Sequence, residues 1–236
     1  MNPAFAELFA LALTLIGPAP KNMPHNFQLK HGETIVAIGD SITQAGGYLR
    51  AADGVLAASY HDMNIPPIIN AGIGGQKAED LAQRFKRDVV DKKPAVVMIS
   101  VGINDVWHRV DKPHDADVLK YYKANVDGMV KHAQTFGIRV ILLAPTIIGE
   151  DPNSEGNKRL AMYVAAEKEV AAEKKCQFVN LHEMFLEALK KKPAEVKGNW
   201  LTADGVHMQP LGDAIMAAGI LRALGVPDAK IAAKAK

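Results

Sequence analysis

Five short apolar runs alternate with segments of helical spacing, and this alternation limits the folds that the chain can adopt. The apolar runs cover residues 34–39, 66–73, 94–102, 138–145 and 176–181. The helical patterns cover residues 47–61, 77–91, 115–137, 157–175, 182–192 and 209–225. Strands that alternate with helices build an open, mostly parallel sheet with helices on both faces. The sequence therefore predicts an α/β fold with three α/β/α layers around a five-stranded parallel sheet.

Nothing in the chain divides this alternating pattern into separate units. The chain has 236 residues, of which 48% are hydrophobic, and this is enough apolar material for one sizeable core. It contains no linker, internal repeat or low-complexity tract between the runs. We therefore expect residues 33–236 to form a single domain, preceded by an N-terminal segment at residues 1–32.

The N-terminal segment is open to two interpretations. Residues 5–24 contain an apolar stretch of the length found in secretory signals, followed by small residues and prolines. Met1–Ala10 lacks the Lys or Arg of such a signal and contains Glu7, and the stretch is too short to span a bilayer. It is either an imperfect or trimmed export signal or an amphipathic helix, with residues 17–32 as a lead-in. An extracytoplasmic and a cytoplasmic location both remain open.

Charge, cysteine and histidine usage argue against several kinds of partner and cofactor. A net charge of +2 gives no sign of a nucleic-acid partner. The single cysteine, Cys176, excludes an intrachain disulfide. The eight histidines form no H-E-x-x-H or H-x-H pair, so no metal site is expected. The G-I-G-G-Q-K stretch has Lys77 where a dinucleotide-binding loop needs its third glycine. The oligomeric state is not predicted.

Glycines and polar residues gather where the predicted strands end. Ligands of open α/β sheets bind at the carboxyl ends of the strands, in the loops that follow them. Three stretches follow predicted strands: Gly39-Asp40-Ser41, Gly72-Ile73-Gly74-Gly75 and Gly102-Ile103-Asn104-Asp105. A fourth, Asp204-Gly205-Val206-His207, lies in a late loop between the last two helices. One rim of the sheet is therefore expected to hold an active site.

These residues have the chemical types that acyl transfer requires. A serine such as Ser41 becomes a nucleophile when a base accepts its proton, and the base is usually a histidine that a carboxylate holds. Asp204 and His207 lie three residues apart, so a loop can present both side chains to one side. An oxyanion needs hydrogen-bond donors. The backbone N–H groups of Ser41 and Gly75 and the Asn104 amide would supply three.

Each of these residues also has a purely structural explanation when it is taken alone. A lone Ser41 is typical of a helix N-cap, and residues 72–75 are typical of a strand-to-helix turn. Asn104 or Asp105 alone suits an Asx-turn, and His207 alone suits a helix start or a surface position. Their occurrence together, in order and at strand ends or in a late loop, favours a hydrolase site.

The same motifs resemble those of a known family. The four blocks are Gly39-Asp40-Ser41, the glycine loop that ends at Gly75, Gly102-Ile103-Asn104-Asp105 and Asp204-Gly205-Val206-His207. In this order they resemble the SGNH, or GDSL, hydrolases over about residues 34–225. The resemblance implies an esterase on a flavodoxin-like sheet, with no metal or organic cofactor. It implies that Ser41 is the nucleophile, His207 the base, Asp204 its support, and Ser41, Gly75 and Asn104 the oxyanion hole.

The resemblance leaves one oxyanion residue open between Gly74 and Gly75. We choose Gly75, because it lies five residues after Asn70, as the family's block usually does. Asp40 and Asp105 also match the motifs, and we expect them to brace their loops.

The substrate is less strongly indicated than the reaction. Trp107 and His108 follow the asparagine block and could line an acyl or sugar pocket, although Trp107 would also suit the core. The motifs resemble the small-ester and carbohydrate-deacetylating branches of the family, and no long lid insertion is evident. We therefore expect hydrolysis of short-chain esters, foremost O-acetyl groups on carbohydrate. The alternatives are a lysophospholipase or thioesterase of the same family, and a carbohydrate-binding protein without catalysis.

Overall fold

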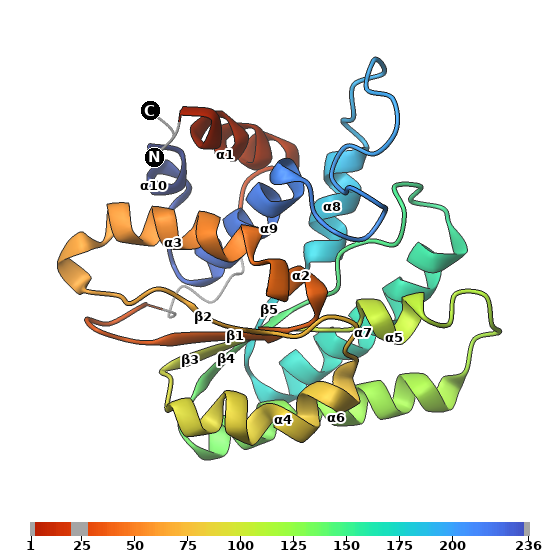
Figure 1. Ribbon diagram of the computed structural model, residues 1–236, viewed down its shortest axis with the longest axis horizontal. Coiled ribbons are helices and arrows are strands. Elements are labelled where there is room, and N and C mark those ends of the chain that lie inside the picture. The colour runs from red at the N-terminus through yellow and green to blue at the C-terminus, as the bar shows by residue number, and fades with distance from the viewer. Residues whose placement is uncertain (1–2, 20–27, 234–236) are drawn as a thin grey trace.

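A five-stranded sheet forms the centre of the computed structural model, which describes residues 3–19 and 28–233 (Figure 1). All strand pairs are parallel, and the strand order is β2-β1-β3-β4-β5. The strands are β1 (Ile35–Gly39), β2 (Ile69–Gly72), β3 (Val96–Ser100), β4 (Arg139–Leu143) and β5 (Gln177–Val179). The predicted α/β fold with a five-stranded parallel sheet is confirmed, and its strand order is that of flavodoxin-like sheets.

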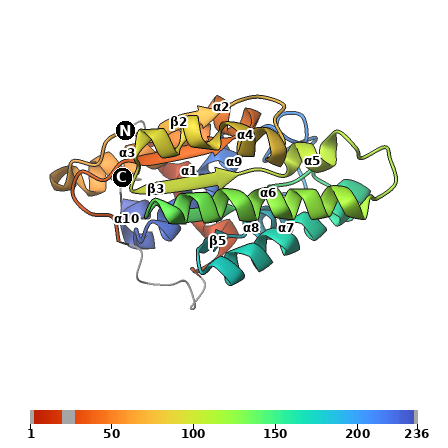
Figure 2. The same cartoon turned by 90° about the horizontal axis from the view of Figure 1, so that it is seen from below.

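Helices cover both faces of the sheet and give the three layers that the sequence predicts (Figure 1 and Figure 2). One layer contains α1 (Pro3–Ile16), α3 (Gly47–Ser59), α8 (Leu181–Leu189), α9 (Pro210–Ala223) and α10 (Asp228–Ala233). The opposite layer contains α4 (Ala78–Asp88), α6 (Ala116–Thr135) and α7 (Glu155–Lys174). Two short helices, α2 (Ser41–Ala45) and α5 (Ile103–Trp107), follow β1 and β3, and 3₁₀ turns lie at His61–Met63 and Val90–Lys92.

The edge strand β2 is shorter than the apolar run that predicted it. Pro66 and Pro67 have no backbone N–H to donate to a strand ladder. The N–H of Ile68 is taken by Asp53 Oδ1 at 3.0 Å. The strand therefore begins at Ile69, whose side chain is exposed, whereas every residue of β1 and β3 is buried. The buried centre of the sheet thus lies at β1 and β3.

Helix α1 packs against α8, α9 and α10. Its side chains Phe9 and Leu15 belong to the buried core. Two cationic side chains bind carbonyls at its C-terminal end: Lys191 Nζ donates to the Leu15 carbonyl at 2.7 Å, and Arg222 Nη2 donates to the Gly17 carbonyl at 2.7 Å. Cations are favourable at this end because the helix dipole is negative there. Residues 3–17 are thereby tied to the helical layer that contains α9.

The lead-in expected at residues 17–32 falls partly outside the described residues, which omit residues 20–27. Its end is held by a hydrogen bond from the Gly32 N–H to the Met63 carbonyl at 2.8 Å. Among the helices within residues 3–19 and 28–233, none combines the length and the apolar character that crossing a membrane requires.

The register of the sheet brings three strand ends together. Gly39 at the end of β1 lies beside Gly72 of β2 on one side and Ser100 of β3 on the other. Gly72 allows the close approach of α2, because a Cβ atom there would lie 2.1 Å from the backbone nitrogen of Gln44. The loops that follow β1, β2 and β3 therefore converge at one rim, next to the point where the strand order changes direction.

Candidate active site

Ser41 is the first residue of α2 and directly follows the end of β1 and Asp40. Asp40, rather than Ser41, caps this helix: its Oδ1 accepts the N–H of Ile42 at 3.0 Å. Burial raises the pKa of Asp40 to about 6, although the bond from Ile42 acts in the opposite direction. The first N–H groups of a helix have no acceptor within the helix, so the N–H of Ser41 is available to a ligand.

Ser41, His207 and Asp204 form a continuous hydrogen-bonded chain. Ser41 Oγ lies 2.9 Å from His207 Nε2, and His207 Nδ1 lies 2.6 Å from Asp204 Oδ2. The other carboxylate oxygen, Oδ1, accepts the backbone N–H groups of Val206 and His207 at 2.9 and 2.8 Å. Desolvation would raise the pKa of Asp204, but the bonds from His207 and Val206 outweigh it and lower the pKa to about 2. The carboxylate is therefore charged at neutral pH.

The loop that carries Asp204 and His207 is closed on itself. The N–H of Ala203 donates to the carbonyl of His207 at 2.7 Å, and the N–H of Gln209 donates to the carbonyl of Leu201 at 2.9 Å. Gly205 occupies the turn with φ +96°, a conformation that other residues rarely adopt. This closure explains how two residues only three positions apart can direct their side chains toward the same partner.

The loop after β2 distinguishes Gly74 from Gly75. The N–H of Gly74 donates to Gln44 Oε1 at 2.9 Å, so it is already engaged. The N–H of Gly75 has no acceptor in the described part of the chain, and its φ is +77°. Asn104 is buried on α5, and its Nδ2 donates to the carbonyl of Gln76 at 3.0 Å, which leaves its second amide hydrogen for another acceptor. Gly75 and Asn104 therefore each keep one donor that no described residue accepts, in addition to the N–H of Ser41.

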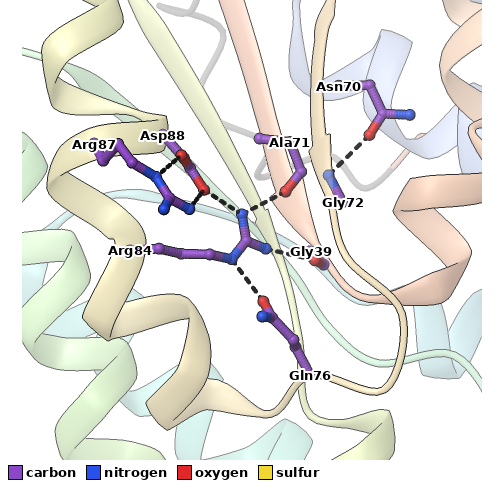
Figure 3. A network of polar contacts seen from close by, with 8 residues as sticks. All are labelled: Gly39, Asn70, Ala71, Gly72, Gln76, Arg84, Arg87 and Asp88. Atoms are coloured by element: carbon purple, nitrogen blue, oxygen red, sulfur yellow. Dashed lines mark hydrogen bonds and ion pairs between the residues drawn. The ribbon is translucent and has the colours of Figure 1, made fainter.

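A buried arginine on α4 connects the strand ends with the glycine loop (Figure 3). Arg84 Nη2 donates to the Gly39 carbonyl at 2.9 Å, and Nη1 donates to the Ala71 carbonyl at 2.8 Å. Its Nε donates to Gln76 Oε1 at 2.6 Å, and Asp88 Oδ2 balances its charge at 2.9 Å. Arg84 thus holds together the end of β1, the end of β2 and the residue after Gly75. The motifs do not include this residue.

A model of the GDSL-like lipase/acylhydrolase family matches residues 37–215, a range that contains all four sequence motifs. This chain belongs to that family. The family predicted from the motifs is confirmed, and with it carboxylic ester hydrolysis as the class of reaction.

The relatives found by sequence and by structure include characterised family members. An acetylxylan esterase from Geobacillus stearothermophilus is 32% identical over 213 residues, which are 82% of this chain and 94% of that protein. A crystal structure of an acetylxylan esterase from the same organism has a TM-score of 0.74 and 31% identity, over 84% of this chain and 96% of the other. Structures of catalytic mutants of that enzyme, with alanine in place of a serine, an aspartate or a histidine, have TM-scores of 0.74 to 0.76. An uncharacterized lipoprotein of Bacillus subtilis is 27% identical over 215 residues, which are 80% of this chain and 88% of that protein.

Trp107 lies beside His207. Its ring centroid is 6.1 Å from that of His207, in an edge-on arrangement, and 6.0 Å from that of His108. Trp107 is 37% exposed, and His108 is exposed as well. Trp107 is therefore not a core residue, and its apolar surface is available to a molecule that approaches His207.

Two buried carboxyl groups lie near the Asn104 segment. Asp105 accepts the N–H of Ala78 at 3.3 and 3.4 Å, and burial raises its pKa to about 7. Glu167 on α7 is fully buried; its Oε2 accepts the hydroxyl of Tyr122 at 3.0 Å, and Oε1 has no partner among the residues described. Burial raises the pKa of Glu167 to about 8, against the effect of Tyr122.

Within the described ranges, no group of three or more His, Cys, Asp or Glu side chains is placed to hold a metal ion.

Replacing Glu167 with glutamine is expected to weaken the pH dependence of stability. The unfolded chain releases this proton near pH 4.5 and the folded chain near pH 8, so the folded state binds more protons between these values. The contribution of Glu167 to the free energy of unfolding therefore falls as the pH rises from 5 to 8. One pKa unit corresponds to about 1.4 kcal/mol. We therefore expect the free energy of unfolding of the variant, measured relative to that of the wild type, to be at least about 1 kcal/mol higher at pH 8 than at pH 5. Urea unfolding at both pH values measures this difference, and the variant Glu169→Gln, at an exposed position, is the control. If the free energy of unfolding changed equally with pH in all three proteins, the prediction would be contradicted.

Proposed function

We propose that this chain is a serine esterase that removes O-acetyl groups from carbohydrate, with Ser41 as nucleophile, His207 as base and Asp204 as its support. The observation that carries the proposal is the chain of contacts from Ser41 Oγ to His207 Nε2 at 2.9 Å and from His207 Nδ1 to Asp204 Oδ2 at 2.6 Å. In this arrangement a base lies within reach of the hydroxyl proton, and a carboxylate orients the base. The spacing therefore supports nucleophilic catalysis at Ser41.

The reaction would proceed in two acyl transfers. Ser41 Oγ attacks the ester carbonyl carbon while its proton passes to His207 Nε2, and the carbonyl π electrons move onto the oxygen. The N–H groups of Ser41 and Gly75 and the Asn104 amide stabilise this oxyanion. When the oxyanion collapses, the C–O bond to the alcohol breaks and the alcohol takes the proton from His207. Water then attacks the acyl-serine with His207 as base, and the acid and free Ser41 are released.

The relatives support both the residue roles and the acetyl substrate. The catalytic mutants of the Geobacillus enzyme replace a serine, an aspartate and a histidine, and its aspartate and histidine lie three positions apart. Asp204 and His207 have the same spacing. That enzyme is an acetylxylan esterase, and this chain covers 96% of its structure. The exposed ring of Trp107 beside His207 provides an apolar surface on which a sugar ring could stack.

A substrate series tests the acetyl-carbohydrate proposal. We expect kcat/KM to be highest for p-nitrophenyl acetate and to fall for the butyrate and octanoate esters. We also expect acetate release from acetylated xylan. A preference for long acyl chains, lysophospholipids or thioesters would favour the other esterase activities of this family. Binding of acetylated xylan without acetate release would favour a carbohydrate-binding protein without catalysis.

Replacing Asn104 with alanine is expected to lower kcat by about 10²–10³-fold with little change in KM, because the amide hydrogen that Gln76 leaves free would bind the developing oxyanion rather than the substrate in its ground state. Steady-state kinetics with p-nitrophenyl acetate measure this effect. Asn125→Ala on α6 is the matched control, since the Asn125 amide donates only to a carbonyl of its own helix. A kcat within twofold of the wild type would remove Asn104 from the proposed oxyanion hole.

An extracytoplasmic location is the second part of the proposal. The similarity to a Bacillus subtilis lipoprotein favours it over a cytoplasmic location. Fractionation of cells that express the full chain with a C-terminal tag tests this, and recovery of all the protein with cytoplasmic markers would contradict it.

A further inference from the structure

Glu150, in the loop between β4 and α7, binds the segment that leads into the Asp204–His207 loop. Its Oε1 accepts the N–H groups of Leu201 and Thr202 at 2.7 and 2.8 Å and the Thr202 hydroxyl at 2.9 Å. Its Oε2 accepts the N–H of Trp200 at 2.7 Å. The Glu150 side chain is only 5% exposed, and Lys192 Nζ lies 3.6 Å from Oε2. One buried carboxylate thus receives three consecutive backbone N–H groups and a hydroxyl.

These contacts act on the part of the chain that must place the catalytic pair. Thr202 is two residues before Asp204 and is joined to Met208 by an isolated antiparallel bridge. The residue before Glu150 contributes as well: the N–H of Gly149 donates to the carbonyl of Gly205 at 2.8 Å. The β4–α7 loop therefore contacts the catalytic loop both at its beginning and at its turn.

The energetics favour Glu150 as the main anchor of this loop. Hydrogen bonds to a charged acceptor are about twice as strong as those between neutral groups, and these four are partly buried. Without Glu150, the N–H groups of residues 200–202 would lose their acceptor in a partly buried position. The loop would then relax toward other partners, because less would offset the entropy that its backbone loses on ordering. Within the loop, Asp204 binds the N–H groups of Val206 and His207, whereas Glu150 ties the start of the loop to the β4–α7 segment.

We propose that Glu150 is a positioning residue for catalysis, which holds residues 200–202 so that the Asp204–His207 pair meets Ser41. Glu150 contacts neither the substrate nor the reacting atoms in this role. The inference rests on the proposed function, because it assigns the purpose of the loop from the roles of Asp204 and His207.

The test compares Glu150→Ala and Glu150→Gln with the control Glu155→Ala. Glu155 is an exposed carboxylate at the start of α7 that pairs with Lys158. A misplacement of about 1 Å in a catalytic group can cost about 10²-fold in rate. We therefore expect Glu150→Ala to lower kcat for p-nitrophenyl acetate by about 10–100-fold with KM nearly unchanged. Glu150→Gln keeps one acceptor oxygen and should lose several-fold.

The pH profile separates positioning from simple loss of stability. A carboxylate beside an imidazole stabilises its protonated form, so a loosened Asp204–His207 pair should move the acid limb of kcat to lower pH in both Glu150 variants. Thermal melting reports the folded fraction. Unchanged kcat and unchanged pH profile per folded enzyme would overturn the proposal, even if the melting temperature falls. Should Glu150→Ala not fold, the same two readouts on Glu150→Gln decide the question.

These outcomes are distinguishable from failure of the proposed function itself. If the wild type and Glu155→Ala hydrolyse the ester and Ser41→Ala does not, the esterase proposal stands whatever Glu150 does. If the Glu150 variants then match the wild type, only the positioning role is wrong.

Discussion

Replacing Ser41 with alanine is expected to lower kcat for p-nitrophenyl acetate by about 10⁴–10⁶-fold, because the variant has no atom that can form the acyl-enzyme. Substrate binding should change little, since the hydroxyl is small and the Gly75 and Asn104 donors remain. The residual rate would reflect the oxyanion donors and substrate binding alone. Stopped-flow or steady-state release of p-nitrophenol, with thermal melting as a check on folding, measures this effect.

Ser59→Ala is the matched control for this substitution. Ser59 Oγ is buried without a hydrogen-bond partner among the described residues. The substitution therefore removes the same hydroxyl group as Ser41→Ala, but outside the site. We expect Ser59→Ala to keep the wild-type rate. Ser41→Ala with more than a tenth of the wild-type kcat would contradict a nucleophilic role for Ser41.

Replacing His207 with alanine is expected to lower kcat by a similar factor of about 10⁴–10⁶, because the Ser41 hydroxyl would lose the base that accepts its proton. The two residues act as a unit, so the double variant Ser41→Ala/His207→Ala should be no slower than either single variant. Asp204→Ala should lose less, about 10⁴-fold, since it acts through His207. The same p-nitrophenyl acetate assay measures all four proteins.

His61→Ala is the control for the histidine substitution, because His61 is largely exposed and pairs only with Asp62. It should leave kcat unchanged. If the losses from Ser41→Ala and His207→Ala instead multiplied in the double variant, the two residues would be acting independently. The hydrogen-bonded chain would then not be the catalytic unit.

The fold could be predicted from the sequence because the local patterns agree with it. Buried parallel strands are largely apolar, as residues 96–99 are, and their separation by helices fixes the parallel arrangement. Boundaries were less well determined: the strand expected at residues 66–73 begins only at Ile69, because two prolines and the Asp53 contact precede it. The packing of α1 against α9 joins residues some 200 positions apart, and no local pattern encodes such a contact.

The candidate site could be predicted where its chemistry lies in short motifs. Ser41, Asn104, Asp204 and His207 each occupy a strand end or the late loop, so their types and order were visible in the sequence. The supporting residues were not visible. Arg84 lies within the polar pattern of α4, and Glu150 lies in a loop; only the folded chain shows which carbonyl and N–H groups they bind. The choice of Gly75 over Gly74 rests in the sequence on its spacing after Asn70, and the Gln44 contact that engages the Gly74 N–H supports it.

The most direct test of the central claim is to locate the nucleophile with a covalent label. The wild type is treated with a fluorophosphonate, a reagent that reacts with the nucleophilic serine of serine hydrolases. Its peptides are then analysed by mass spectrometry. The proposed mechanism predicts one adduct per chain, on Ser41, with complete loss of esterase activity and no labelling of Ser41→Ala or His207→Ala. Complete inactivation with the adduct on another residue, or an unlabelled Ser41 in active enzyme, would contradict it.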